Sequence, residues 1–600
     1  MTEHLLIQIM GIVFLGIAAK WISWKFQLPS ILLLLIIGVC AGPVTGFLNP
    51  DELLGKLLFP VVSISVAIIL FEGGLSLSLQ KLKDVGGVFT NLITLGALLT
   101  WAIAAASAHV ILGFHLELSV LLGAILVVTG PTVIIPLLAH IHPNARLSAI
   151  LKWEGIVIDP IGAMLAVLVF ETILAGGFSR APLILMMGVL KTVLFGGGIG
   201  VFVAYLMIQA YKHYWIPDEL TNAVSMAAVI SAFVLSNHFQ SESGLLTVTL
   251  MGILLANQKE INIRPLVQFK ETLRVLLIST LFIILAARLT PQDLSFVNSG
   301  SFLFLAVLIF IARPLSVWVS TYKSELNWRE KVFLACVAPR GIIAASVSSV
   351  FALYLVERNY PGAEELVPIT FFVIVGTVTF YGLGAAWIAK LLGVGAAASQ
   401  GVLMIGAHPW SRGLAKTLLE ENIKVLMVDT NRTNVHQAKM ENIPVSNLSA
   451  LSQEFLDEVE LEGIGKLLAF TSNDQVNSLA AVRFKEVFSP ADVYQLSPQK
   501  SEKEKEEVSK HLQGRILFGP KITFDYLTLR FLSGAQIKKT KLSAEFTFEQ
   551  FQNQYGSMAV PLFVINEKKQ LSICTAEKFI SPKAGQTVIS LVDVKTENSS

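Results

Sequence analysis

The sequence is poor in charged residues and in cysteine. Asp, Glu, Lys and Arg make up 15% of its 600 residues, against about 25% in a typical soluble chain. The three cysteines, Cys40, Cys336 and Cys574, are too few and too far apart for a disulfide framework or a thiolate metal site. The net charge of +2 is too small to indicate a nucleic-acid partner.

Apolar residues are correspondingly abundant, at 54% of the chain. This exceeds what a soluble core can bury and excludes disordered and fibrous classes. The charges are sparse up to about Ala396 and dense beyond it. We therefore expect a membrane domain over 1–396, followed by a tail with one domain over 397–500 and a linker plus small β-rich subdomain over 501–600. The start of the chain lacks a basic n-region, so the first apolar run is expected to be retained.

Thirteen apolar stretches are long enough to cross a membrane as helices of about 20 residues. They lie near 4–23, 29–48, 56–80, 86–113, 118–140, 146–175, 181–211, 219–238, 243–258, 267–288, 299–323, 329–356 and 364–395. Thirteen Lys and Arg residues fall in the odd-numbered connections and only four in the even-numbered ones. The positive-inside rule then predicts a multi-pass protein of the cell (inner) membrane, with its N-terminus outside and its tail in the cytoplasm.

We expect two of these stretches to be broken near the middle by proline and glycine. The fifth carries Gly130 and Pro131, and the twelfth carries Pro339 and Gly341. Interrupted helices at membrane depth are tolerated where they line a cavity, and matching interruptions in two halves mark a transporter's binding site. Because the two lie seven helices apart, we expect inverted repeats over helices 1–6 and 8–13, with helices 5 and 12 crossing.

Acidic groups inside the spans are costly and therefore informative. Asp159 lies near the middle of the sixth helix, with Gly155 and Gly162 on its own face, where they would leave room for an ion. Glu154 points about 140° away from Asp159, and an arginine is expected to pair with it. Arg340 is the first candidate and Arg313 the second; this pair would be structural.

Three further groups are candidates for the same site. Glu72 lies in the third span, and Thr129 and Thr132 flank the break in the fifth. Each has a simpler explanation: Glu72 would form a structural ion pair, and the threonines would bond to backbone freed by the proline. Asp159 also has a simpler explanation, in which it caps a broken helix or pairs with an arginine and binds no ion.

Together these motifs resemble the NhaP/NHE branch of the cation:proton antiporters over nearly all of residues 1–396. The resemblance implies that Asp159 alternately holds a proton or the transported metal ion, Na⁺ or K⁺. It also implies that the Thr129 carbonyl and Glu72 support the site, that Glu154 pairs with an arginine, and that the protein is a homodimer with an elevator-like core.

The chain departs from the usual pattern of this branch at three positions. Gly130 stands where an aspartate is common, Ile158 where an asparagine is common, and Gly155 where a serine is common. A single mobile carboxylate still favours one-for-one, electroneutral exchange. Burial favours the protonated form of Asp159 and a bound cation favours the deprotonated form, so the two should compete.

The tail alternates short β runs with helices from Gly401 onward, which predicts a Rossmann-like domain. It resembles the nucleotide-binding domain of TrkA-type potassium-transport regulators. The glycine fingerprint is damaged, since Gly406 is its one remaining glycine. The candidate nucleotide-binding residues are Gly406, Ser411, Arg412, Asp429 and Asn473. A regulatory NAD(H) or adenine nucleotide and a module that binds nothing are both compatible with this pattern.

The sequence thus predicts a proton antiporter for Na⁺ or K⁺ that needs no cofactor for transport, serves pH homeostasis and is regulated by its tail. A potassium channel or efflux system gated by a similar tail is the alternative. The Thr-Val-Gly-Tyr-Gly filter of potassium channels is missing from the sequence, and buried acids suit proton coupling better. A membrane-bound dinucleotide enzyme is disfavoured by the damaged fingerprint.

Overall fold

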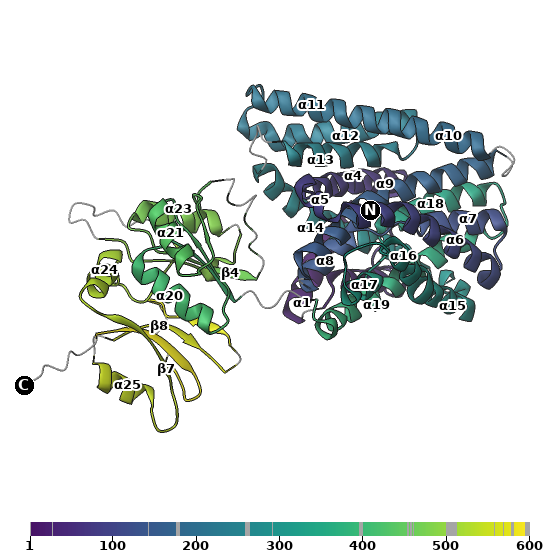
Figure 1. Ribbon diagram of the computed structural model, residues 1–600. Helices are drawn as coiled ribbons and strands as arrows, with labels where there is room; N and C mark the ends of the chain where they lie inside the picture. The colour runs from purple at the N-terminus through teal and green to yellow at the C-terminus, as the bar shows by residue number, and fades with distance from the viewer. Residues whose placement is uncertain are drawn as a thin grey trace, which may run out of the picture. The chain divides into compact units, whose positions relative to one another are not determined.

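The computed structural model divides into two compact units, Met1–Gly395 and Ala396–Ser600 (Figure 1). It describes residues 2–26, 28–141, 143–175, 181–258, 264–290, 292–394, 400–452, 455, 459, 461, 463–485, 487–499, 513–556, 559–567, 569–577 and 581–593. The charged run 501–510, expected to be a linker, lies outside the described residues.

The first unit is built from helices, and its described residues form no β-strand. Its α-helices are α1 (Thr2–Phe26), α2 (Ser30–Val39), α3 (Pro50–Leu54), α4 (Leu58–Leu75), α5 (Leu79–Asn91), α6 (Ala97–Ser107), α7 (Leu116–Ile125), α8 (Pro131–Ile141), α9 (Ala145–Leu174), α10 (Ala181–Lys191), α11 (Gly198–Lys212), α12 (Thr221–Phe239), α13 (Ser243–Asn257), α14 (Arg264–Ala287), α15 (Ser299–Val307), α16 (Arg313–Ser320), α17 (Trp328–Ala335), α18 (Ile342–Glu357) and α19 (Leu366–Leu392).

Several long helices contain a π-helical turn, in which the i→i+5 pattern inserts a bulge. These turns are η1 (Cys40–Val44), η3 (Leu92–Gly96), η4 (Ala108–Leu112), η6 (Thr192–Gly197) and η9 (Leu308–Ala312). Short 3₁₀ helices are η2 (Gly55–Leu57), η7 (Asp218–Leu220), η8 (Asp293–Phe296) and η10 (Ala363–Glu365). The turn η3 directly precedes α6, and η9 directly precedes α16. The two turns pack reciprocally, because η3 contacts α16 and η9 contacts α6.

Eight helical segments of the described chain are long and apolar enough to cross a membrane. They are Leu5–Phe26, Pro50–Leu75, Gly86–Leu112, Arg146–Leu174, Met186–Lys212, Thr221–Phe239, Ser299–Ser320 and Ala363–Leu392. Shorter apolar helices occupy Ser30–Val44, Leu116–Ile125, Ser243–Asn257, Thr272–Ala287 and Ile342–Glu357. Large apolar side chains such as Phe14, Phe202 and Trp387 are exposed, as expected where lipid replaces water.

The second unit contains two sheets. The first has parallel strands in the order β3-β2-β1-β4-β5-β6, and the second has antiparallel strands in the order β7-β10-β8-β9. The strands are β1 (Gly401–Ile405), β2 (Val425–Val428), β3 (Val445–Ser446), β4 (Ile464–Ala469), β5 (Val493–Gln495), β6 (Arg515–Ile516), β7 (Gln536–Lys541), β8 (Val560–Ile565), β9 (Leu571–Ile573) and β10 (Thr587–Val592). The helices are α20 (Pro409–Glu420), α21 (Arg432–Met440), α23 (Asp474–Phe484), α24 (Phe524–Leu532), α25 (Phe548–Tyr555) and the 3₁₀ helix η11 (Pro490–Asp492).

The parallel sheet has the doubly wound order in which β1 lies between β2 and β4. Leu403 pairs in register with Leu426 of β2 and Leu467 of β4, and both contacts are parallel. The strands are buried because helices cover the sheet, which explains their continuous apolar runs. The α/β parallel tail that the sequence predicts is therefore present.

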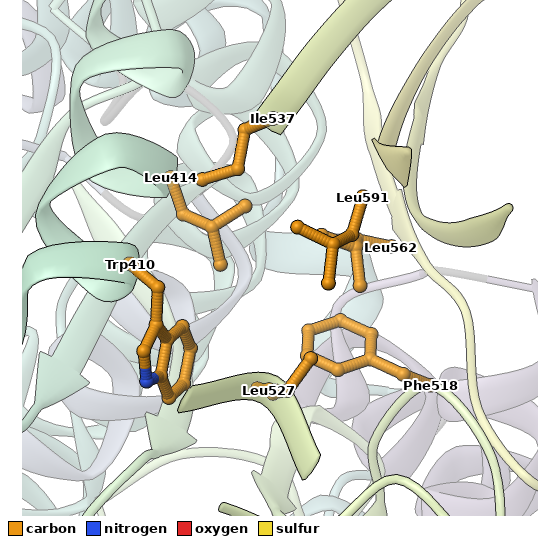
Figure 2. Close-up of a pocket in the computed structure, with 7 residues that line it drawn as sticks. All are labelled: Trp410, Leu414, Phe518, Leu527, Ile537, Leu562 and Leu591. Atoms are coloured by element: carbon orange, nitrogen blue, oxygen red, sulfur yellow. The ribbon is translucent and has the colours of Figure 1, made fainter. Parts of the chain in front are cut away.

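The two sheets of the tail share one apolar core. Trp410 and Leu414 from α20 face Phe518, Leu562 and Leu591 across a small cavity (Figure 2). The indole Nε1 of Trp410 also donates to Thr528 Oγ1 on α24 at 3.2 Å. Because α20 begins directly after the first turn of the Rossmann-like sheet, this core attaches that turn to the C-terminal part of the tail.

Candidate functional site

Two interruptions in the helical unit meet backbone to backbone. Residues 126–130 separate α7 from α8, and residues 336–341 separate α17 from α18. Pro131 and Pro339 have no N–H to donate, so neither segment can continue a regular helical ladder. A Cβ built on Gly130 would lie 2.7 Å from the Cα of Gly341, and a Cβ on Gly341 would lie 2.7 Å from the Cα of Gly130. Only glycine at both positions permits this approach.

Arg340 supplies donors to the carbonyl groups freed by the first interruption. Its Nη1 donates to the Val127 oxygen at 3.2 Å and to the Val128 oxygen at 3.3 Å, and the side chain is buried. Helix C-terminal carbonyls carry partial negative charge, so a buried guanidinium stabilises this end of α7. Arg340 thus contacts the break in the other half of the unit.

Arg313 does the same for the second interruption. Its Nε donates to the Leu334 oxygen at 3.2 Å and its Nη2 donates to the Val337 oxygen at 3.0 Å. Arg313 begins α16 directly after the π-helical turn η9, whose bulge displaces the following residues relative to a regular helix. The two arginines therefore act as equivalent caps on the two broken helices.

Glu154 forms its ion pair with Arg313. Both guanidinium Nη atoms donate to the carboxylate, one of them at 2.9 Å from Nη2 to Oε2, and both side chains are buried. The expectation that ranked Arg340 first is therefore wrong, and the second candidate forms the pair. The reason is that Arg340 is held by the backbone of 127–128. The planar guanidinium of Arg313 has enough donors to bond the Glu154 carboxylate and two backbone carbonyls at the same time.

Asp159 is fully buried in the middle of α9. Neither of its carboxylate oxygens has a hydrogen-bond partner among the described residues, and the same holds for the buried hydroxyls of Thr129 and Thr132. Unpaired buried polar groups are rare in proteins and call for an unseen water, ion or proton. The unpartnered carboxylate of Asp159 is the strongest candidate for an ion-binding group in the described chain.

The glycines beside Asp159 bring the first interruption against α9. A Cβ on Gly155 would lie 2.7 Å from Ile134 Cδ1 and 3.5 Å from the Thr129 carbonyl oxygen. A Cβ on Gly162 would lie 2.5 Å from Val128 Cγ2. The expectation that these glycines leave open room is wrong, because α8 and the 126–130 segment fill it; they place the Thr129 carbonyl against α9 instead.

Glu72 has a partner of its own. It lies on α4, buried, and its Oε1 accepts a hydrogen bond at 2.7 Å from Nη1 of Arg274 on α14. This pairing favours the structural role for Glu72 over a place in the ion site. Sequence reasoning missed Arg274, although an arginine inside the apolar run 267–288 is the kind of residue that signals a buried acidic partner.

The tail holds a separate cavity of about 260 Å³ at the carboxyl ends of β1, β2 and β4. Gly406, Asp429 and Asn473 line it, as expected from the sequence. Ser411 and Arg412 turn back to the chain instead. The Ser411 hydroxyl donates to the Gly406 and His408 carbonyls, and Arg412 donates to the Ala407 carbonyl and to Glu441.

A family model described as sodium/hydrogen exchanger, transmembrane, matches residues 9–391. The chain belongs to the sodium/hydrogen exchanger family. It is thus a secondary transporter and not an enzyme. A second model, the TrkA-N domain, matches residues 402–508, and this domain is a nucleotide-binding regulatory fold.

Curated relatives of this exchanger are antiporters. It is 26% identical over 396 residues to the K(+)/H(+) antiporter NhaP of Alkalimonas amylolytica, covering 65% of this chain and 67% of that one. It is 24% identical over 373 residues to a K(+)/H(+) antiporter of Shewanella oneidensis, covering 62% and 63%. It is 26% identical over 358 residues to the Na(+)/H(+) antiporter 1 of Methanocaldococcus jannaschii, covering 57% and 82%. The match thus spans about two thirds of the length of each of these two potassium antiporters.

The exchanger also has the fold of a solved relative. A structure of a sodium proton antiporter from Methanocaldococcus jannaschii at pH 8 superposes with a TM-score of 0.56 at 22% sequence identity. The match covers 65% of this chain and all of that one. The membrane unit therefore has the sodium/proton antiporter fold, as the sequence predicts.

Proposed function

We propose that this exchanger moves protons against Na⁺ or K⁺ by alternating access, with Asp159 as the group that binds either. The observation that carries the proposal is the fully buried Asp159 carboxylate, which has no hydrogen-bond partner among the described residues. A bare charge in this position would be costly, so it should hold a proton or a cation in every state that crosses the membrane. Proton and cation then compete for one site.

The groups around Asp159 suit a monovalent cation. Carbonyl groups of interrupted helices coordinate Na⁺ in transporters, and the Thr129 carbonyl lies against α9 at Gly155, about one turn before Asp159. The buried hydroxyls of Thr129 and Thr132, in and just after the same interruption, are also without hydrogen-bond partners among the described residues. Glu154 and Arg313 neutralise each other nearby. Protonated and cation-loaded Asp159 carry the same net charge, which supports one-for-one electroneutral exchange.

The thirteen-span topology is part of the same proposal. Each of the eight long and five shorter apolar helices of the described chain overlaps one of the thirteen stretches expected from the sequence, which supports this count. We infer inverted repeats over spans 1–6 and 8–13, with the fifth and twelfth crossing at Gly130 and Gly341. The charge bias of the loops supports an N-terminus outside the inner membrane and a tail in the cytoplasm. We expect a homodimer.

The choice of cation is inferred from the relatives, whose names include both K⁺ and Na⁺ antiporters. A proton exchanger for either ion would serve pH homeostasis. The TrkA-N match supports regulation by the tail through a ligand in its crevice, with NAD(H) or an adenine nucleotide as the classes expected from the fold.

The test uses purified protein in liposomes with an internal pH dye, challenged with Na⁺, K⁺ or Li⁺. Asp159→Asn should abolish cation-dependent proton movement while leaving the protein folded in detergent. Asp51→Asn, which removes an exposed carboxylate paired with Arg288 at the start of α3, is the matched control and should retain exchange. Robust exchange by Asp159→Asn would refute the assignment.

A further inference from the structure

The crevice in the tail lies where a Rossmann fold binds the two halves of a dinucleotide, and the chain has altered one half of it. In such folds the first turn presents backbone N–H groups to a pyrophosphate, and an acid after the second strand holds a ribose. Here the first turn runs from Gly406 to Trp410, and the acid is Asp429. In this structure the pyrophosphate half of the crevice is altered, and the half that would hold the ribose and base is retained.

The N–H groups of the first turn are already used by the chain. The Gly406 N–H donates to the Val428 oxygen at 2.8 Å, and the Ala407 N–H donates to Asp429 Oδ2 at 2.8 Å. Pro409 is the first residue of α20 and has no N–H. Three of the donors that a pyrophosphate would need are thus spent or missing.

The side chain of His408 occupies the place where a pyrophosphate would approach. His408 stands where the G-x-G-x-x-G fingerprint has its second glycine, a residue that lets the backbone come close to the pyrophosphate. A Cβ on Gly406 would lie 3.2 Å from both Cδ2 and Nε2 of the His408 imidazole. The imidazole packs edge-on against the Phe524 ring, with the two ring centroids 4.8 Å apart. Trp410, buried against the C-terminal part of the tail (Figure 2), holds the turn in this conformation.

Charge in the crevice also opposes phosphate. Asp429 lines it, and the described residues that line it include no lysine or arginine, because Arg412 turns to the Ala407 carbonyl and Glu441. Burial lowers the pKa of the His408 imidazole, with Arg412 acting in the same direction and Asp429 opposing them. The ring is therefore mostly neutral at cytoplasmic pH.

The ribose and base half is intact. Three donors reach Asp429: the Asn431 N–H on Oδ1, and the Ala407 N–H and the Asn434 amide on Oδ2. A carboxylate accepts about four hydrogen bonds, which leaves one position on Oδ1 for a ligand hydroxyl. Leu448 and Leu451 supply an apolar wall for a base. The volume of about 260 Å³ is below the roughly 300–1,000 Å³ of pockets that enclose a drug-sized ligand.

We propose that this crevice binds an uncharged nucleoside and excludes dinucleotides and nucleoside phosphates. A ribose hydroxyl donates to Asp429, the base lies against the Leu448–Leu451 wall, and the 5′ end meets the neutral His408 ring where other Rossmann folds hold phosphate. This inference rests on the proposed regulatory role of the tail and narrows its ligand from the nucleotides expected from the fold.

The experiment is calorimetric titration of the purified full-length protein in detergent with adenosine, AMP, ATP, NAD⁺ and NADH. Adenosine should bind at least tenfold more tightly than any of the phosphorylated ligands. Tighter or equal binding of NAD⁺, NADH, AMP or ATP would overturn the proposal, and so would the failure of adenosine to bind at all.

Two variants locate the effect. Asp429→Asn should weaken adenosine binding about tenfold, because a charge-assisted hydrogen bond becomes a neutral one. Asp492→Asn removes a carboxylate that pairs with Lys466 beside the start of β5, away from the crevice, and should leave binding unchanged. Equal effects of the two substitutions would contradict the placement.

A third variant tests the exclusion of phosphate by a gain of function. His408→Gly combined with Pro409→Ala restores the open turn and its N–H, and should raise NAD⁺ affinity at least tenfold relative to the unmodified chain. Unchanged NAD⁺ affinity in a folded protein would overturn the role of these two residues. Transport assays separate this inference from the proposed function: adenosine that binds without altering exchange would refute regulation and leave the ligand assignment standing.

Discussion

Gly130 and Gly341 hold the two interrupted helices of the exchanger in direct backbone contact. A Cβ on either residue would lie 2.7 Å from the Cα of the other, which is closer than real Cβ contacts allow. This explains why position 130 has no side chain in this chain. The first of these segments packs against α9 at Gly155 and Gly162, on either side of Asp159, and the glycine contact joins the second segment to it.

We predict that Gly341→Ala strongly reduces exchange. The added methyl must displace the backbone of Gly130, at a cost of at least the roughly 1–3 kcal/mol typical of overpacking, and this shifts the Thr129 carbonyl relative to Asp159. Gly197→Ala is the matched control, since a Cβ there meets nothing within 4 Å. Initial rates in liposomes and melting temperatures of both variants test this; normal exchange by Gly341→Ala would show that the contact is dispensable.

Local sequence accounts for part of the membrane unit. Gly130-Pro131 and Pro339-x-Gly341 lie at the two interruptions, where proline removes a donor. Gly42-Pro43 and Pro160-x-Gly162 have the same patterns but lie within helical segments, so packing decides which of these sites breaks. The pairing of Glu154 was not predictable. It depends on which helices cross and on the π-helical turn η9 before Arg313, and single-residue spacing carries neither. The packing around the glycines beside Asp159 was not predictable for the same reason: their partners belong to other segments, Ile134 to α8 and Val128 to the interruption before it.

In the tail, the sequence predicts the strands and the acid after β2, because alternating apolar runs and turn residues are local signals. The hydrogen-bond partners of Ser411 and Arg412 could not be predicted from their spacing in the sequence. Both side chains lie near the first turn, but whether they face a ligand or their own backbone depends on the packing of α20 against the rest of the tail. The damaged fingerprint was the one local sign that this turn differs.

We predict that Glu154 and Arg313 are strongly coupled in stability. Removing one partner leaves a buried charge unpaired, so Glu154→Gln alone should destabilise the protein by roughly 3–5 kcal/mol. The double variant Glu154→Gln/Arg313→Met should be less destabilised than the sum of the single variants. Thermal melts of the four proteins in one detergent measure the coupling. If the losses of stability in the two single variants simply add up in the double variant, the interaction between Glu154 and Arg313 contributes nothing to stability.

We predict that Arg340 acts through the backbone of the first interruption. Arg340→Met leaves the Val127 and Val128 carbonyls without this donor, at a cost of roughly 1–3 kcal/mol for groups buried unpaired. Exchange should fall, and Arg340→Lys should restore part of it, because lysine keeps the charge with fewer donors. The half-saturating cation concentration should rise more than the maximal rate falls. A pure loss of maximal rate would point to a role in the motion instead.

The competition at Asp159 predicts a specific pH dependence. A proton and a cation exclude each other from one carboxylate, so each must raise the apparent half-saturating concentration of the other. Where the site is mostly protonated, lowering the pH by one unit should raise the half-saturating Na⁺ or K⁺ concentration about tenfold, with the same maximal rate. The effect should vanish at high pH, where protons no longer compete. Because either loaded form carries the same charge, a membrane potential imposed with a gradient of the permeant anion thiocyanate, at equal K⁺ on both sides, should leave the Na⁺/H⁺ exchange rate unchanged. A potential-dependent rate would indicate a second titrating group, and a pH-independent half-saturation would mean that proton and cation bind at different sites.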